Sequence, residues 1–334
     1  MKVIIPLAGL GTRLRPHTYT KPKPLINVAG KPMLAHILDQ LSLLDVEEYI
    51  FIVGYLGEQI EQYVSREYKF KARYVMQHEM LGQAHALWLC RDYVDQAVFM
   101  VFGDTFFKTD LSEITRSPTD SIAYVREIED PRRFGVAIAD QNNYVKKFVE
   151  KPSSIDDKLA VIGMYYFTDG PALMKACAEL MDKRIQTKGE YFLTDAINLM
   201  LTAGAKFVTR TVDVWQDTGK PETVLQTNRY LLDHGYNTSE QAEYDTCVIV
   251  PPVNIHPSAK LEHSIIGPYA TIGPECKITR SIIRNSIIDA GAQIEETMLD
   301  QSLIGKEAVV TSRFRRFNVG DSAVVGFSDA NHDE

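Results

Sequence analysis

Apolar residues in the first third of the chain follow two alternating periods. Short, nearly continuous apolar runs occupy residues 2–7, 48–54, 72–77 and 97–104. Between them, residues 32–44, 57–68 and 82–94 carry apolar side chains three and four positions apart. Buried strands give the first pattern and amphipathic helices the second. The alternation predicts β-α-β units and an α/β fold with a Rossmann-like, mostly parallel sheet.

The middle of the chain continues this α/β pattern. Further strands are expected at residues 121–128, 135–140, 145–152 and 160–167, and helices near 171–187 and 193–204. A single final strand over residues 207–219 is expected to lead into a helix that begins near Pro221. We expect this segment to extend the first sheet and not to form a domain of its own.

The pattern changes beyond residue 245, where helical periodicity ends and aliphatic residues recur at intervals of five or six. They are Ile255, Leu261, Ile266, Ile272, Ile278, Ile283, Ile288, Ile294, Leu299, Ile304 and Val310. A small residue often lies two positions earlier, as at Ala259, Ala270, Cys276, Ala292 and Ala308. This hexapeptide repeat is typical of a left-handed parallel β-helix. We therefore predict two domains, residues 1–240 and residues 245–330.

Composition and charge narrow the function classes. The 334-residue chain has a formal net charge of −8, from 44 acidic and 36 basic residues, which argues against a surface that binds nucleic acid throughout. Its four cysteines are scattered singly, without metal-type spacing, and are expected to be reduced core residues: Cys90, Cys177, Cys247 and Cys276. No leader pattern and no apolar run of roughly 18 residues is found. The expected location is cytoplasmic, without a membrane partner.

A basic loop stands out in this acidic chain. The stretch "PLAGLGTRLRPHTYTKPKPL", residues 6–25, follows the first predicted strand and holds five basic side chains: Arg13, Arg15, His17, Lys21 and Lys23. Gly9 and Gly11 allow a tight turn whose N–H groups can approach an anion, and Thr12 can add a hydroxyl. A solvated basic loop is the simpler alternative.

The position of this loop and the absence of two common phosphate-binding motifs narrow the chemistry that it can serve. Ligands of parallel sheets bind beyond the carboxyl ends of the strands, so Gly103 and Asp104 are expected on the same rim as the loop. Neither a Walker motif nor a complete G-x-G-x-x-G is present. Ordinary ATPase and dinucleotide chemistry are therefore not indicated.

The ordered motifs of the chain resemble those of the sugar nucleotidyltransferases, also called NDP-sugar pyrophosphorylases. The matching stretches are "AGLGTRLRP", "KPKPL", "GKPM", "QHEMLGQAHAL", "FGDTFF", "FGV", "EKP", "IGMYYF", "GEYFLTDAI" and "WQDTGKP". With the β-helix they cover nearly the whole chain, and the long form of glucose-1-phosphate thymidylyltransferase is most similar. The resemblance implies that a nucleoside triphosphate and a sugar 1-phosphate give an NDP-sugar and pyrophosphate, with Mg²⁺.

The resemblance also implies roles for individual residues. Arg13 would contact the pyrophosphate leaving group and Lys23 the α-phosphate region, while Asp104 and Asp217 would hold Mg²⁺. The implied nucleotide-binding residues are Leu7, Gly9, Gly11, Thr12, Gln77 and Gly82. The implied sugar-phosphate-binding residues are Gly135, Glu150, Lys151, Tyr165 and Glu190. The amide of Gln77 can both donate to and accept from a pyrimidine base.

Several alternatives follow from the same residues. Ala8 replaces a glycine common in the family, as in some uridylyltransferases, so dTTP and UTP with glucose 1-phosphate both fit. A GDP-mannose or N-acetylglucosamine specificity, or a non-catalytic regulatory homologue, is the alternative function. A β-helix can also carry an acyltransferase histidine, for which His256 and His263 are candidates. Because every implied site residue precedes residue 240, we expect the β-helix to serve packing or homo-oligomer assembly.

Overall fold

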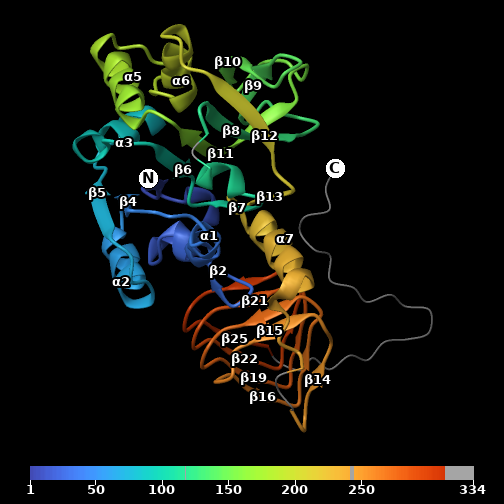
Figure 1. The fold of residues 1–334 in the computed structure, drawn as a ribbon. Coiled ribbons are helices and arrows are strands. Elements are labelled where there is room, and N and C mark those ends of the chain that lie inside the picture. The colour runs from blue at the N-terminus through green and yellow to red at the C-terminus, as the bar shows by residue number, and fades with distance from the viewer. Residues whose placement is uncertain (117, 241–243, 313–334) are drawn as a thin grey trace.

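A mostly parallel sheet forms the centre of the first part of the chain. The computed structural model describes residues 1–116, 118–240 and 244–312 (Figure 1). The four strands expected first are β1 (Lys2–Pro6), β4 (Glu48–Val53), β5 (Ala72–Met76) and β6 (Val98–Val101). Strand β1 lies between β4 and β6, and β5 pairs with β4, all in parallel. Their carboxyl ends therefore share one rim.

Five more strands extend the sheet beyond β6. They are β8 (Ser121–Glu127), β9 (Gly135–Ala139), β10 (Val145–Glu150), β11 (Leu159–Phe167) and β12 (Phe207–Thr211). Strand β11 runs antiparallel to β6, β8 and β9 and so joins the two halves. The sheet has nine strands, with the main order β10-β9-β11-β6-β1-β4-β5. The predicted mostly parallel α/β fold is confirmed.

Helices cover both faces of the sheet, each burying an apolar side. The helices are α1 (Met33–Leu41), α2 (Gly57–Glu67), α3 (Gln83–Trp88), α4 (Ser112–Thr115), α5 (Gly170–Asp182), α6 (Leu193–Thr202) and α7 (Pro221–Leu231). Leu34 of α1 and Val224 of α7 share one buried cluster, while Leu173 of α5 and Ile197 of α6 share the other. Short 3-10 helices and a π-helix complete this part: Thr12–Leu14, His17–Tyr19, Lys23–Leu25, Arg91–Tyr93 and Leu232–Tyr236.

The prediction of a single strand over residues 207–219 is wrong, because the structure divides this segment into two strands in different sheets. Strand β12 pairs with β8 in the large sheet, whereas β13 (Val214–Asp217) pairs antiparallel with β7 (Thr105–Lys108). The guanidinium of Arg126 donates to the carbonyl oxygens of Val212 and Asp213, each at 2.8 Å, and holds the chain where it changes sheets. The division places Asp217 opposite Thr105, at the start of β7.

The helix expected over residues 171–187 also ends early. Helix α5 stops at Asp182, and Arg184 adopts a left-handed conformation with φ 53°. The Ile185 N–H then donates back to the Leu180 carbonyl at 2.8 Å, which satisfies an orphan carbonyl at the helix end. A local capping arrangement therefore overrides the apolar period of the sequence.

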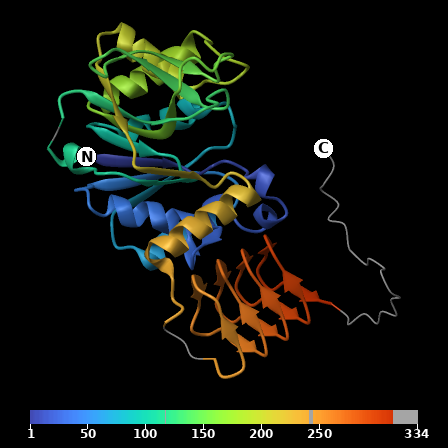
Figure 2. The same ribbon diagram turned by 90° about the vertical axis from the view of Figure 1, so that its right-hand side faces the viewer.

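Residues 248–311 form three short parallel sheets that stack as a β-helix (Figure 2). The sheets are β14-β17-β20-β23 (Val248–Ile249, Ile265–Ile266, Ile282–Ile283, Met298–Leu299), β15-β18-β21-β24 (Val253–Ile255, Ala270–Ile272, Ile287–Ile288, Leu303–Ile304) and β16-β19-β22-β25 (Lys260–Glu262, Lys277–Thr279, Gln293–Glu295, Val309–Thr311). Ile266, Ile278 and Ile288 have no exposed surface. The hexapeptide prediction is confirmed, and the architecture is consistent with a left-handed β-helix.

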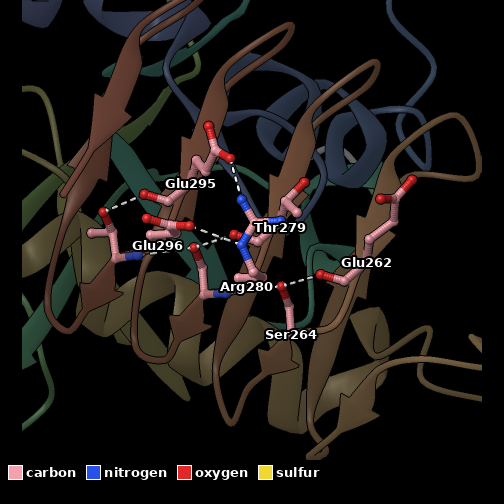
Figure 3. A network of polar contacts seen from close by, with 8 residues as sticks. Glu262, Ser264, Thr279, Arg280, Glu295 and Glu296 are labelled. Atoms are coloured by element: carbon pink, nitrogen blue, oxygen red, sulfur yellow. Dashed lines mark hydrogen bonds and ion pairs between the residues drawn. The ribbon is translucent and has the colours of Figure 1, made fainter. Parts of the chain in front are cut away.

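Polar side chains connect neighbouring coils at one corner of the β-helix (Figure 3). Ser264 Oγ donates to the Glu262 carbonyl and accepts from the Ser281 N–H of the next coil at 3.1 Å. Arg280 turns the corner with φ 48°, and its guanidinium pairs with Glu295 and Glu296. The corner thus satisfies backbone groups that the short strands leave unpaired.

The β-helix packs against α7 and the hairpin formed by β2 (Asn27–Val28) and β3 (Lys31–Pro32). Asn228 of α7, 1% exposed, accepts from the Ala29 N–H at 2.8 Å and from Thr271 Oγ1 of the β-helix at 2.7 Å. The predicted division between residues 240 and 245 includes residues 241–243, which lie outside the described residues. The boundary stays a prediction, as does the part of the second domain beyond residue 312.

Candidate active site

A loop over residues 7–27, here called the signature loop, leaves the carboxyl end of β1 and carries the basic residues. Gly11 adopts φ 61°, and a Cβ added to it would lie 3.0 Å from both the Lys23 Cβ and the Thr18 Cγ2. Thr18 Oγ1 donates to the Gly11 carbonyl at 2.8 Å. A glycine is therefore required where the two ends of the loop approach each other.

The signature loop borders a first cavity of about 440 Å³ at the rim of the sheet. This cavity is lined by the candidate residues Leu7, Gly9, Gly11, Thr12, Arg13, Lys23, Gln77, Gly82, Asp104 and Glu190, together with Gln83, Phe102 and Gly219. Most of these residues lie in the segments that follow β1, β5 and β6, whereas Glu190 precedes α6 and Gly219 follows β13. All six of the implied nucleotide-binding residues thus lie around one cavity, as the parallel strand ends predict.

A second cavity of about 260 Å³ adjoins the first. Among its lining residues are the candidates Gly135, Glu150, Lys151, Tyr165 and Asp217, contributed by the strands β9, β10, β11 and β13 and the residue after β10. Arg13, Gln83, Phe102 and Asp104 line both cavities. Two ligands bound side by side would therefore meet at a wall that contains one cation and one carboxylate.

Opposite charges gather at this shared wall. Lys23 Nζ lies 2.5 Å from Asp104 Oδ2, and their side chains are 13% and 38% exposed. Thr218 donates to the Asp104 carbonyl from both its N–H, at 3.1 Å, and its Oγ1, at 3.0 Å, which places the neighbouring Asp217 close to Asp104. Burial, reinforced by the Asp104 carboxylate, raises the pKa of Asp217, and Lys23 and Arg13 oppose this.

Two carboxylates in this position suit a hard divalent cation only when the ligand adds oxygens. No cluster of three or more His, Cys, Asp or Glu side chains suited to a metal ion occurs within the described ranges. Mg²⁺ is commonly held by one or two carboxylates plus substrate phosphates and water. Asp104 and Asp217 fit that pattern, since burial and then the Asp104 carboxylate raise the pKa of Asp217, and a cation between the two carboxylates would oppose both effects.

Glu150 introduces a half-buried carboxylate into the second cavity. Burial raises its pKa, against the opposing effects of the Lys151 cation and of Thr194, whose Oγ1 donates to Glu150 Oε2 at 3.3 Å. A Cβ added to Gly135 would lie 3.1 Å from the same Oε2. Lys151 Nζ lies 4.7 Å from the centre of the Phe192 ring, a cation-π distance. The second cavity therefore offers a carboxylate that can accept hydrogen bonds, Glu150, and a cation, Lys151.

The segment Gln77–Gly82 forms the far wall of the first cavity. Gln77 is 6% exposed, and its Nε2 donates to the Glu79 carbonyl at 3.1 Å. Gly82 has φ 108°, and an added Cβ would lie 2.5 Å from the Tyr191 carbonyl oxygen. The Tyr191 N–H donates to the Leu81 carbonyl at 2.9 Å. This pairing draws the segment before α6 against the first cavity.

Two of the candidates, Glu190 and Tyr165, are placed differently from the other residues in their predicted group. Glu190 lies along the first cavity and not with the sugar-phosphate candidates, because Tyr191 is bonded to Leu81. Tyr165 lines the second cavity but is only 3% exposed and belongs to a core cluster, and burial raises its pKa. The functional roles of both residues stay predictions.

Sequence reasoning missed several residues of the cavity walls. Gln83 and Phe102 line both cavities, and Arg133, Thr194 and Trp215 line the second. Each lies within or beside a motif that had been noted: Gln83 in "GQAHAL", Phe102 in "FGD", Thr194 in "FLTDAI" and Trp215 in "WQDTG". Attention to neighbours of the matched positions would have found them.

His256, His263 and the four cysteines line neither cavity. His256 and His263 lie exposed on the β-helix, where His256 Nδ1 lies 2.9 Å from Ser258 Oγ and the His263 N–H donates to Thr246 Oγ1. The four cysteines are free, as expected; three are buried, while Cys247 is only partly buried. Within the part of the chain that the structure describes, no helix has the length and apolar character needed to cross a bilayer.

Comparison with family models gives two adjoining matches. Residues 2–234 match the model described as nucleotidyl transferase, and residues 234–325 match the model described as GlmU-like, C-terminal hexapeptide. The first match includes every candidate site residue, and the second includes the β-helix.

Individual relatives agree with these models. The bifunctional protein GlmU of Methanocaldococcus jannaschii is 35% identical over 75% of this chain, and the alignment spans 59% of that relative's length. The UTP–glucose-1-phosphate uridylyltransferase AglF of Haloferax volcanii is 34% identical, covering 66% of this chain and 93% of AglF. A solved Bacillus anthracis structure, provisionally assigned as glucose-1-phosphate thymidylyltransferase, is 27% identical with a TM-score of 0.60, covering 73% of this chain and all of that one.

Proposed function

We propose, because this chain belongs to the nucleotidyl transferase family, that it joins a nucleoside triphosphate to a sugar 1-phosphate and releases pyrophosphate. The most favoured substrates are dTTP or UTP with glucose 1-phosphate. One observation supports this reaction above all: two adjoining cavities share Arg13 and Asp104 as a common wall. A triphosphate in the first cavity would meet the phosphate of a sugar in the second at that wall.

The charges at the shared wall suit this reaction. The sugar phosphate must approach the α-phosphorus of a polyanion, so neutralisation and alignment provide most of the catalysis. Arg13 would bind the leaving pyrophosphate and Lys23 the α-phosphate region. Lys23 now lies against Asp104, so a phosphate oxygen would replace or share that contact. Asp104 and Asp217 would hold Mg²⁺, which supplies positive charge beside the reacting phosphates.

The remaining candidates fit binding roles in the two cavities. Gln77 would read the base through its amide, since a buried amide that meets a pyrimidine edge discriminates between bases. Glu150 would accept hydrogen bonds from sugar hydroxyls, and Lys151 would contact the sugar phosphate. Glu190 lines the first cavity and not the second, so it would contact the sugar from the nucleotide side. Leu7, Gly9 and Thr12 would contact the nucleotide.

The test is a screen for pyrophosphate release. Five nucleotides are crossed with several sugar 1-phosphates, with Mg²⁺ and with a metal-free control. We expect turnover with dTTP or UTP and glucose 1-phosphate. Turnover only with GTP and mannose 1-phosphate, or only with N-acetylglucosamine 1-phosphate, would support the alternative specificities. No turnover with any pair would favour a non-catalytic homologue. A cytoplasmic location and a homo-oligomeric state stay predictions.

A further inference from the structure

The signature loop is in direct contact with the β-helix. Ile287 of β21 belongs to the same buried cluster as Leu14 and Leu25 of the loop, and Leu303 of β24 packs against that cluster. Figure 1 shows β2, at the end of the loop, above β21. The coil that contains Ile287 is therefore part of the support beneath the first cavity.

Asp289, which follows β21, makes the polar contacts in this interface. Its Oδ2 is paired with Lys21 Nζ, and its Oδ1 accepts from Asn27 Nδ2 at 2.7 Å. The Ala290 N–H also donates to Oδ1, at 2.9 Å, which fixes the carboxylate on its own coil. The side chains of Asp289 and Lys21 are only 13% and 22% exposed. Partly buried pairs of this kind are screened by salt much less than surface pairs.

These contacts set the position of the loop segment that carries Lys23. Lys21 is separated from Lys23 by Pro22 alone, and a proline ring restricts the backbone between them. On the opposite side, Tyr55 Oη donates to the Tyr19 carbonyl at 3.0 Å. A displaced Lys21 would thus move Lys23, whose ammonium lies 2.5 Å from Asp104 at the shared wall of the two cavities.

We propose that Asp289 is a positioning residue of the nucleotidyltransferase site, so that the β-helix holds the signature loop in the geometry that binds a triphosphate. This inference rests on the proposed function. Asp289 acts through Lys21 and Asn27 and contacts neither cavity. The second cavity is built largely on β9, β10 and β11 and receives only Arg13 from the signature loop, so loss of Asp289 affects binding of the sugar 1-phosphate less than binding of the nucleotide.

The test compares Asp289→Asn with wild type and with the matched control Asp300→Asn. Asp300 is also a β-helix carboxylate with two polar partners, accepting from Arg284 at 3.0 Å and from Asn285 at 2.8 Å. We expect Asp289→Asn to lower kcat/KM for the nucleotide by about five- to a hundredfold, the range expected when a reacting group is slightly misplaced. KM for the sugar 1-phosphate rises less than KM for the nucleotide, since Arg13 is the one signature-loop residue that lines the second cavity. Asp300→Asn matches wild type.

A double-mutant cycle makes the result specific to the contact. In the Lys21→Met background, Asp289→Asn should cost much less than it does alone, because the partner is already absent. Lys21→Arg, which keeps the charge, should retain most of the activity. Equal losses in the two backgrounds, or equal rises in both KM values, would show a general weakening of the fold and would overturn the inference.

Binding measurements separate this inference from the proposed reaction. Affinity for UTP and for dTTP is measured by calorimetry on the same variants. If wild type binds a nucleotide but turns over no substrate pair, the proposed function fails while the calorimetry still tests Asp289. If Asp289→Asn binds and turns over as wild type does, only the inference fails. If Asp289→Asn does not fold, Lys21→Met takes its place in the test, because it removes the same ion pair from the loop side.

Discussion

The two cavities share a wall but are stabilised in different ways. The first is bordered by loops that leave parallel strand ends, and its charged residues Lys23 and Asp104 are already paired. The second is built largely on strands and contains the half-buried carboxylates Glu150 and Asp217, both with raised pKa values. The first therefore depends on what holds its loops, whereas the second contains acids whose burial costs stability.

The difference shows where each cavity is vulnerable. The shape of the first cavity depends on the backbone conformation of its glycines and on contacts that hold the signature loop from outside, because a loop lacks the regular hydrogen bonds of a strand. In the second cavity the strands fix the backbone, so ligand binding depends mainly on the charges of individual side chains. Substitutions in the two cavities should therefore separate effects on folding from effects on ligand binding.

The largest effect is expected at the shared wall. Asp104→Asn and Asp217→Asn should each lower kcat by at least about a hundredfold, since metal-assisted charge stabilisation contributes several kcal/mol. Both variants should retain the fold, as judged by circular dichroism. Turnover is measured across a range of Mg²⁺ concentrations. Near-normal turnover at limiting Mg²⁺ in either variant would remove that residue from the metal site.

A pair of glycines in the first cavity should separate folding from binding. Gly82→Ala places a Cβ against the Tyr191 backbone at a φ of 108°, and should lower the free energy of unfolding by about 1–3 kcal/mol or more. Gly9→Ala meets no atom within 4 Å and should fold as wild type does, yet weaken triphosphate binding. Thermal melting and nucleotide titration measure the two effects. Equal melting temperatures for the two variants would contradict this contrast.

Gln77 should affect the base and not the phosphates. Gln77→Glu replaces an amide donor with a carboxylate facing the O4 of uracil or thymine, at a cost of roughly 1–3 kcal/mol. The efficiency with dTTP and UTP should fall, and the efficiency with CTP should fall less. Steady-state rates with the three nucleotides give the comparison. A uniform decrease, or none, would show that Gln77 does not read the base.

The smallest effect is expected from Glu150, the half-buried acid of the second cavity. Because burial raises the pKa of Glu150, its contribution to stability is greatest below its unfolded pKa of about 4.3 and is lost as the pH rises through the folded value. Glu150→Gln should therefore melt slightly higher than wild type at pH 7, with a smaller difference at pH 5. The exposed Glu129→Gln is the control. A lower melting temperature at pH 7 would reverse the argument.

Local periodicity predicted much of the fold. The aliphatic residues from Ile255 to Val310 all lie on β-helix strands, because each coil repeats the same short-range pattern. The strands ending near Leu7 and Gly103 were predicted for the same reason, and the rim followed from their parallel pairing. The division at Val212 was not predicted, since it depends on Arg126, which lies far away in the sequence.

The candidate residues line the two cavities, but their roles stay predictions, and their arrangement depends on contacts that the sequence does not show. Arg13 and Asp104 were expected on one rim, and the structure places them on a shared wall. Glu190 was expected with the sugar residues, and its actual cavity depends on a backbone pairing between Tyr191 and Leu81. The contact between Lys21 and Asp289 joins residues 268 positions apart and has no local signal. Tertiary contacts of this kind escape pattern reasoning.

The regular stacking of the β-helix has a consequence for insertions and deletions. Ile265 pairs with Ile282, so removal of residues 265–281 would leave a coil that still closes in register. Neighbouring strands are about 4.8 Å apart, so the deletion would carry Asp289 by that distance along the axis, away from Lys21. An added coil after Thr311 would leave Asp289 in place. If Asp289 must meet Lys21, we expect natural variation in the length of the β-helix to fall after Asp289 and not before it.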